Sequence, residues 1–121
     1  MRNLSSTAAV AVLACLCAAL AGCGESPAEK ERARAVQLIK SAGCGGCHEI
    51  PGVDGAEGRV GPPLKGVGGR TFLAGMIRNT PENMVAWLKD PQAIAPGNAM
   101  PNMGLSDKDA RTIAFYLDRL R

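Results

Sequence analysis

Apolar residues recur at helical spacing in the segment from Ala28 to Ser41. Ala35, Leu38 and Ile39 fall on one face, and the charged residues between Glu29 and Arg34 fall on the other. This alternation has the 3.6-residue period of an amphipathic helix. The pattern predicts a first helix that packs through one side and ends before Gly43.

Two more helices are predicted in the C-terminal half. Thr80 followed by Pro81 is typical of a helix start, and Pro91 disfavours continuation beyond Asp90. Ser106 and Asp109 have the spacing of a capping box, and an apolar stripe at helical spacing follows them. The residues of that stripe are Ala110, Ile113, Ala114, Leu117 and Leu120.

Glycine and proline dominate the segments between these helices, which predicts long loops over residues 49–70 and 91–104. A short helix is expected near Phe72 to Ile77. No strand alternation or internal repeat is evident, so the expected fold class is all-α, with about four helices and long ordered loops. The chain has one Trp, one Tyr and two Phe, so a large apolar cofactor would supply core that aromatic side chains do not.

The N-terminus has the features of an export signal. Arg2 precedes an apolar run from Ala8 to Ala21, which is too short to span a bilayer. The run ends in the residues LAGC, which resemble the lipobox of bacterial lipoproteins, where the cysteine carries the lipid. We therefore expect a signal peptide over residues 1–22, a lipidated tether over 23–28 that begins at Cys23, and a folded domain over 29–121.

Cleavage before Cys23 would remove Cys15 and Cys17 and leave Cys44 and Cys47 as the free thiols of an exported protein. The remaining chain would carry thirteen basic and eleven acidic residues with no basic cluster. This balance argues against a nucleic-acid partner. The expected location is the periplasmic side of a membrane, held there by the lipid.

The residues CGGCH, Cys44 to His48, carry the most specific chemistry of the sequence. A structural zinc site needs four ligands, and a thioredoxin-like dithiol needs a βαβ context; this chain offers neither pattern. A disulfide alone would not explain the adjacent histidine. This spacing is typical of c-type haem attachment through two thioethers, with His48 as an axial ligand of the iron.

Because His48 is the only histidine, a second axial ligand would be a methionine, whose soft thioether raises the reduction potential. Met84 and Met76 fall in or near apolar helical patterns and are expected to pack. Met100 and Met103 lie on a loop stiffened by prolines and are the stronger candidates.

The chain resembles a class I cytochrome c with one haem over nearly all of residues 29–121. The residues GPPL from Gly61 are similar to the family's Gly-Pro-x-Leu, which implies that the Pro62 carbonyl accepts the ligand histidine's other ring proton. The resemblance implies that Arg70 faces a haem propionate. It also implies that Met100, directly before Pro101, is the axial ligand rather than Met103.

Residues 79–106 resemble most closely the cytochrome c domain fused to subunit II of some haem–copper oxidases. Trp87 falls where the family often has a tyrosine near the methionine sulfur, and either core packing or an indole N–H contact would explain it. Tyr116 matches the aromatic residue of the family's last helix.

The resemblance implies a membrane-tethered electron carrier that is not an enzyme. Its redox partners would be proteins, such as a membrane-bound oxidase or reductase. The alternative is a haem-bearing subunit of a larger dehydrogenase or reductase complex. Peroxidase activity is disfavoured, because such chemistry commonly uses a second histidine, which the chain lacks.

Overall fold

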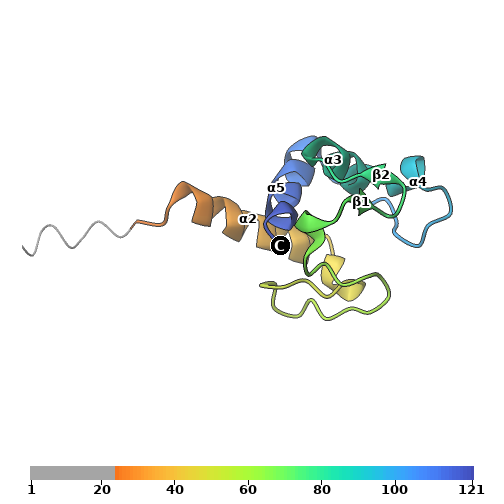
Figure 1. Ribbon diagram of the computed structural model, residues 1–121. Helices are drawn as coiled ribbons and strands as arrows, with labels where there is room; N and C mark the ends of the chain where they lie inside the picture. Colours follow the sequence, from red (N-terminus) through yellow and green to blue (C-terminus); the bar gives the residue numbers. More distant parts are fainter. Residues whose placement is uncertain (1–23) are drawn as a thin grey trace, which may run out of the picture.

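The computed structural model describes residues 24–121 (Figure 1), so the predicted signal peptide over 1–22 and the lipid site at Cys23 lie outside the described residues. The first described helix is α2, Pro27–Ser41. Ser26 caps it by accepting a hydrogen bond from the Glu29 amide at 3.2 Å, while the Glu29 carboxylate accepts from the Ser26 amide at 2.7 Å. This reciprocal pair is a capping box, and it starts the predicted first helix at Pro27.

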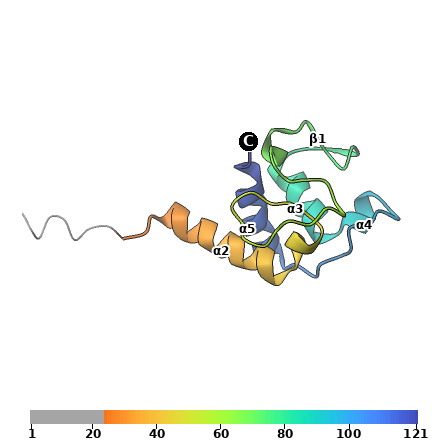
Figure 2. The same cartoon turned by 90° about the horizontal axis from the view of Figure 1, so that it is seen from below.

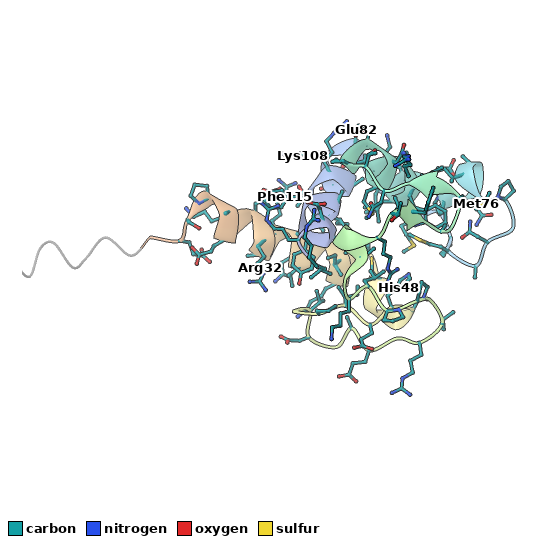
Figure 3. The ribbon with its side chains drawn as sticks, viewed as in Figure 1. Arg32, His48, Met76, Glu82, Lys108 and Phe115 are labelled. Carbon is teal, nitrogen blue, oxygen red and sulfur yellow. The ribbon has the colours of Figure 1, made fainter. Side chains whose placement is uncertain are left out.

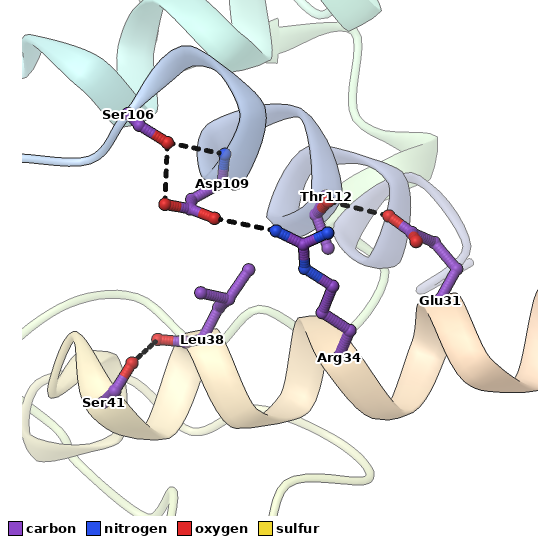
Figure 4. Close-up of polar contacts among 7 residues, drawn as sticks. All are labelled: Glu31, Arg34, Leu38, Ser41, Ser106, Asp109 and Thr112. Atoms are coloured by element: carbon purple, nitrogen blue, oxygen red, sulfur yellow. Dashed lines mark hydrogen bonds and ion pairs between the residues drawn. The ribbon is translucent and has the colours of Figure 1, made fainter.

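The last helix, α5, spans Asp107–Asp118 and packs against α2. Figure 4 shows two polar contacts between the helices, Thr112 to Glu31 at 2.7 Å and Arg34 to Asp109 at 3.2 Å. Asp109 also accepts a hydrogen bond from the Ser106 hydroxyl, so the cap of α5 is joined to α2. The helix predicted from the Ser106 capping signal is confirmed.

Helix α3 spans Pro81–Lys89, and Thr80 caps it through the Asn83 amide, as the sequence predicts. It packs against α5. Asp107 at the start of α5 pairs with Arg111 at 2.7 Å and with Lys89 of α3 at 3.3 Å. Hydrogen bonds from Arg111 and then Lys89 hold the pKa of Asp107 below its usual value, because they favour the charged carboxylate.

The segment after α3 differs from the expected loop. Pro91–Ile94 form a short helix, α4, whose first turn is capped by Asp90 accepting from the Ala93 amide at 3.1 Å. Proline ends α3 and at the same time fits the first position of α4, where no amide proton is needed. The predicted loop therefore begins only after Ile94.

The helix expected over Phe72 to Ile77 is wrong. Phe72–Leu73 (β1) and Ile77–Arg78 (β2) form a two-stranded antiparallel hairpin instead. Ala74 and Gly75 both have positive φ, at 49° and 69°, and the Met76 amide donates to the Leu73 carbonyl at 2.9 Å. Such a left-handed turn reverses the chain and is incompatible with a helix at this point.

The buried core lies along α5, which packs against both α2 and α3 (Figures 1 and 2), and it includes the fully buried Ala35, Ile39 and Ile113. Tyr116 donates a hydrogen bond to the Pro51 carbonyl at 2.6 Å, which ties the loop after α2 to α5. Two one-turn 3₁₀ helices, η1 (Cys44–Gly46) and η2 (Val67–Gly69), lie in the loops. Within residues 24–121, no helix has the length and apolar character needed to cross a membrane.

We predict that Ala35→Leu lowers the free energy of unfolding by about 1–3 kcal/mol, because the added atoms have no space in the packed interior. Ala35 is completely buried in α2, whereas Ala33 on the same helix is exposed. Ala33→Leu is therefore the matched control and should change stability by less than about 0.5 kcal/mol in denaturant titrations. Equal effects of both substitutions would contradict the burial described for this face.

Candidate functional site

The end of α2 delivers the CGGCH residues to one place. Gly43 follows the helix with φ of 71°, a left-handed conformation that glycine adopts without strain. The chain then turns through η1, and the amides of Cys47 and His48 both donate to the Cys44 carbonyl, at 3.2 and 2.9 Å. These bonds bring the two cysteines and the histidine onto one compact turn.

The half-buried His48 ring is oriented by the loop that follows. Its Nδ1 lies 2.7 Å from the Pro62 carbonyl oxygen. Because a carbonyl oxygen can only accept, Nδ1 must carry the proton, and in the neutral ring Nε2 then keeps its lone pair. A fixed tautomer with a free Nε2 is the form that binds a metal.

Gly61 makes this approach possible. Its amide donates to the Cys47 carbonyl at 2.8 Å, which holds the GPPL segment against the CGGCH turn. A Cβ at position 61 would lie 2.3 Å from the nearest atom of the His48 ring, so only glycine leaves room for the imidazole. The glycine of the GPPL motif is thus a steric requirement of the site.

Arg70 supports the same loop. Its Nη2 donates to the carbonyl of Pro63, next to Pro62, and it lies 3.4 Å from the carbonyl of Lys65. Arg70 does not line the cavity described below. Within the described residues, the Arg70 side chain therefore bonds the backbone next to Pro62, whose carbonyl accepts from His48.

The loop from Ala95 to Leu105 brings Met100 to the wall of a cavity of about 350 Å³. Cys44, Cys47 and His48 line this cavity together with Met100 and Met103. The remaining lining residues are Gly43, Val60, Gly61, Pro62, Ala74, Trp87, Asn98, Ala99 and Pro101. Residues far apart in the sequence therefore form one largely apolar space.

The other two methionines of residues 24–121 lie elsewhere. Met84 is only 4% exposed and belongs to the core, as expected. The packing expected for Met76 is wrong, because this residue is 60% exposed on the hairpin. Figure 3 shows His48 on the lower loop and Met76 beside the upper elements of the fold. Neither Met76 nor Met84 lines the cavity, so within the described part of the chain Met100 and Met103 are the methionines that do.

The remaining predicted site residues are Trp87 and the two cysteines. Trp87 is half-buried against the core and lines the cavity, and among residues 24–121 no hydrogen bond of its indole nitrogen is found. Cys44 and Cys47 form no disulfide in the described chain. Burial raises the pKa of the Cys44 thiol, so it stays protonated at neutral pH.

Sequence reasoning missed four residues of the cavity wall. Val60, Ala74 and Ala99 carry no chemical signal, and Ala74 was expected in a helix. Asn98 could have been found, because an asparagine two residues before Met100 is typical of a side chain that bonds its own backbone nearby. Its Oδ1 accepts from the Met100 amide at 2.8 Å.

The donor set and the cavity fit a covalently bound haem. The CGGCH turn offers two unpaired thiols and an imidazole with its Nε2 free, and the loop of Met100 and Met103 offers thioether sulfurs to the same cavity. The lining residues include no Asp, Glu, Lys or Arg, so the space suits an apolar macrocycle. Within residues 24–121, no group of three His, Cys, Asp or Glu side chains comes together as a metal site of the zinc type.

Comparison with known proteins gives a family match that includes both walls of this cavity. The family model described as cytochrome c matches residues 33–121. Subunit 2 of cytochrome c oxidase from Alkalihalophilus pseudofirmus is 34% identical over 98 residues, which cover 80% of this chain and 28% of the relative. The corresponding subunit of Bacillus subtilis is 38% identical over 102 residues, which cover 80% of this chain and 29% of the relative.

A third relative with the same description, from Bacillus sp. (strain PS3), is 36% identical over 89 residues, or 70% of this chain and 25% of its own length. The chain thus spans less than a third of the length of the curated relatives it matches.

We predict that Gly61→Ala displaces the His48 ring from the Pro62 carbonyl, because the new methyl group would occupy the ring's position. In the parent protein the hydrogen-bonded Nδ1 proton should exchange slowly and be visible by NMR; in the variant it should be lost. Gly69→Ala is the control, since a Cβ there meets nothing within 4 Å. Retention of the Nδ1 resonance in Gly61→Ala would refute the steric argument.

Proposed function

The chain belongs to the cytochrome c family and carries covalently attached haem c for electron transfer, and on this basis we propose that Cys44 and Cys47 form the thioether links. His48 and Met100 are proposed as the two axial ligands of the iron. The observation that carries the proposal is the meeting of all four side chains around one cavity. When bound, the haem supplies a single centre that takes up and releases one electron.

The contacts of His48 support its role as a ligand. The Pro62 carbonyl holds the Nδ1 proton and thereby fixes the ring's orientation and raises the basicity of Nε2. Arg70 holds the adjacent Pro63 carbonyl and so keeps the acceptor in place. A propionate contact of Arg70 remains part of the proposal, because its guanidinium has further donors beyond Nη2.

Met100 is proposed over Met103 although both face the cavity. Met100 precedes Pro101, which cannot donate a backbone hydrogen bond and has a fixed φ. Hydrogen bonds hold both the amide and the carbonyl of Met100. Trp87 also lines the cavity, and its apolar ring would help to exclude water from the space around a sulfur ligand.

The lining supports an electron carrier rather than an enzyme. Apart from His48 and the two cysteines, the cavity wall contains no titratable side chain, so it provides no acid–base group for a bound substrate. Apolar walls limit solvent access and lower the local dielectric, which tunes the reduction potential.

A terminal oxidase is the proposed electron acceptor or assembly partner. Support comes from the relatives, which are named as cytochrome c oxidase subunits. The residues matched cover less than a third of those subunits, and we propose that the haem-carrying domain meets such an enzyme at a membrane. Among residues 49–104, five basic and five acidic residues balance, and docking should respond weakly to salt.

Membrane attachment through a lipid on Cys23 is proposed from the lipobox-like LAGC residues. Only Gly24 to Ser26 separate that cysteine from α2, a flexible reach of about 10 Å. The 15 residues of α2 add about 22 Å of rigid helix before the CGGCH turn. Such a tether confines the haem to a thin layer above the lipid and raises its effective concentration for a membrane partner.

We predict that the Cys44→Ala, Cys47→Ala double variant loses all haem to acid–acetone extraction, whereas the parent protein retains it. Each single variant should keep one thioether and show a shifted pyridine haemochrome band, because one vinyl group stays unreacted. Retention of haem by the extracted double variant would show that attachment does not use this pair.

We predict that Cys23→Ser moves the exported protein from the membrane to the soluble fraction, or leaves its signal uncleaved. Cys17→Ser, within the expected signal peptide, is the matched control and should leave fractionation unchanged. The measurement is haem staining of separated membrane and soluble fractions. A Cys23→Ser protein that is processed and still sediments with membranes would exclude the lipid tether.

A further inference from the structure

Two side-chain amides occupy the segment between α4 and Met100. The Gln92 Nε2 donates to the carbonyls of Asn98 and Met100, both at 2.9 Å. The Gln92 Oε1 accepts from the Gly97 amide at 3.0 Å. One side chain on a helical turn therefore bonds three points of the loop that follows.

Asn98 complements these bonds from within the loop. Its Nδ2 donates to the carbonyls of Pro91 and Ala95, at 3.0 and 2.6 Å, and its Oδ1 accepts from the Met100 amide at 2.8 Å. Both side chains are half-buried, where an amide left without partners would be costly. Gln92 and Asn98, which we call the amide clamp, thus direct their donors and acceptors at the backbone of residues 91–100.

Met100 is the residue on which the clamp converges. Its amide is held by Asn98 and its carbonyl by Gln92, so both peptide groups beside its Cα are fixed. Met103 also faces the cavity, but within the described chain no hydrogen bond holds its backbone amide or carbonyl. The two methionines therefore differ in how firmly the protein holds them.

The base of the clamp is rigid. Pro91 is among the most deeply buried residues, and Asp90 caps α4 directly at the end of α3. Helix α3 in turn packs against α5. The hydrogen bonds of Gln92 and Asn98 therefore connect the backbone of Met100 to a segment that is itself anchored on the core.

We propose that Gln92 and Asn98 are positioning residues that keep the Met100 sulfur on the haem side of the cavity. The proposal rests on the proposed function, in which Met100 is an axial ligand. A thioether is a neutral ligand. The fraction of protein in which the Met100 sulfur would be bound therefore depends on how often the loop holds it in place. Removing the clamp should leave the CGGCH wall unchanged and increase the fraction of protein in which the Met100 position is open.

Imidazole competition measures that fraction. An added ligand binds only the open form, so its apparent affinity rises in proportion to the population of that form. Gln92→Ala removes two donated bonds, and we expect the ferric holoprotein to bind imidazole about tenfold more tightly than the parent. The sulfur-to-iron absorption band reports the same displacement without reference to electron-transfer activity.

Asn79→Ala is the matched control. Asn79 is also a half-buried amide, and its Nδ2 donates to two backbone carbonyls, those of Val67 and Arg70, at 2.9 and 3.0 Å. It does not line the cavity, and its side-chain hydrogen bonds go to residues outside the Met100 loop segment. Asn79→Ala should lower global stability by a similar amount and leave the imidazole affinity unchanged. If the imidazole affinity rises equally in Asn79→Ala and Gln92→Ala, a general loss of stability explains it and the proposal is overturned.

Hydrogen exchange on the unmodified holoprotein provides an answer even if Gln92→Ala does not fold. The Met100 amide, bonded to Asn98, should be strongly protected, while the amides of Ala99 and Met103 should exchange quickly. Comparable exchange of all three amides would overturn the clamp. Gln92→Glu, which keeps the Oε1 acceptor but loses both donors, should behave like Gln92→Ala.

Met100→Ala separates failure of the clamp from failure of the ligand assignment. If it removes the sulfur band and Gln92→Ala does not alter imidazole affinity, Met100 is the ligand and the clamp proposal is wrong. If Met100→Ala leaves both the band and the imidazole affinity unchanged, the ligand assignment is wrong and the positioning role falls with it.

Discussion

The packing of α2 against α5 determines where the functional cavity can form. Ala35 and Ile39 are buried at this crossing, and the contacts of Glu31 and Arg34 with α5 set its orientation. Gly43 ends α2 with a left-handed turn, so the direction of the helix fixes the position of Cys44. The CGGCH turn, the proposed point of haem attachment, thus depends on a helix contact that contains no proposed haem ligand.

The cavity joins two walls of different character. Around His48, backbone carbonyls set the geometry. The Gly61 amide donates to the Cys47 carbonyl, and Nδ1 of His48 donates to the Pro62 carbonyl. On the methionine wall, side-chain amides hold a loop that has little regular structure. In the proposed ligation, His48 provides a strong nitrogen donor of fixed orientation, and Met100 provides a weaker sulfur donor on a loop held by side-chain amides. Such a pair would suit a haem that exchanges electrons without changing its ligands.

Much of this arrangement could be predicted from the sequence. The helices α2, α3 and α5 follow from their apolar periodicity and caps, and the all-α class I cytochrome c fold is confirmed by the family match. Local signals sufficed because each helix has its own start and stop residues.

The hairpin at Phe72–Arg78 was not predictable in this way, because it depends on Ala74 adopting a positive φ that alanine rarely takes. Helix α4 was missed because Pro91 was interpreted only as a stop. The Gln92 and Asn98 contacts depend on loop geometry that no periodic pattern encodes.

The central claim is that this cavity holds one haem between His48 and Met100, and an experimental structure of the haem-loaded protein tests it most directly. We expect thioether bonds to Cys44 and Cys47, iron bonded to His48 Nε2 and Met100 Sδ on opposite faces, and Nδ1 still donating to the Pro62 carbonyl. Iron bonded to the sulfur of Met103, or a His48 ring turned away from Pro62, would contradict it.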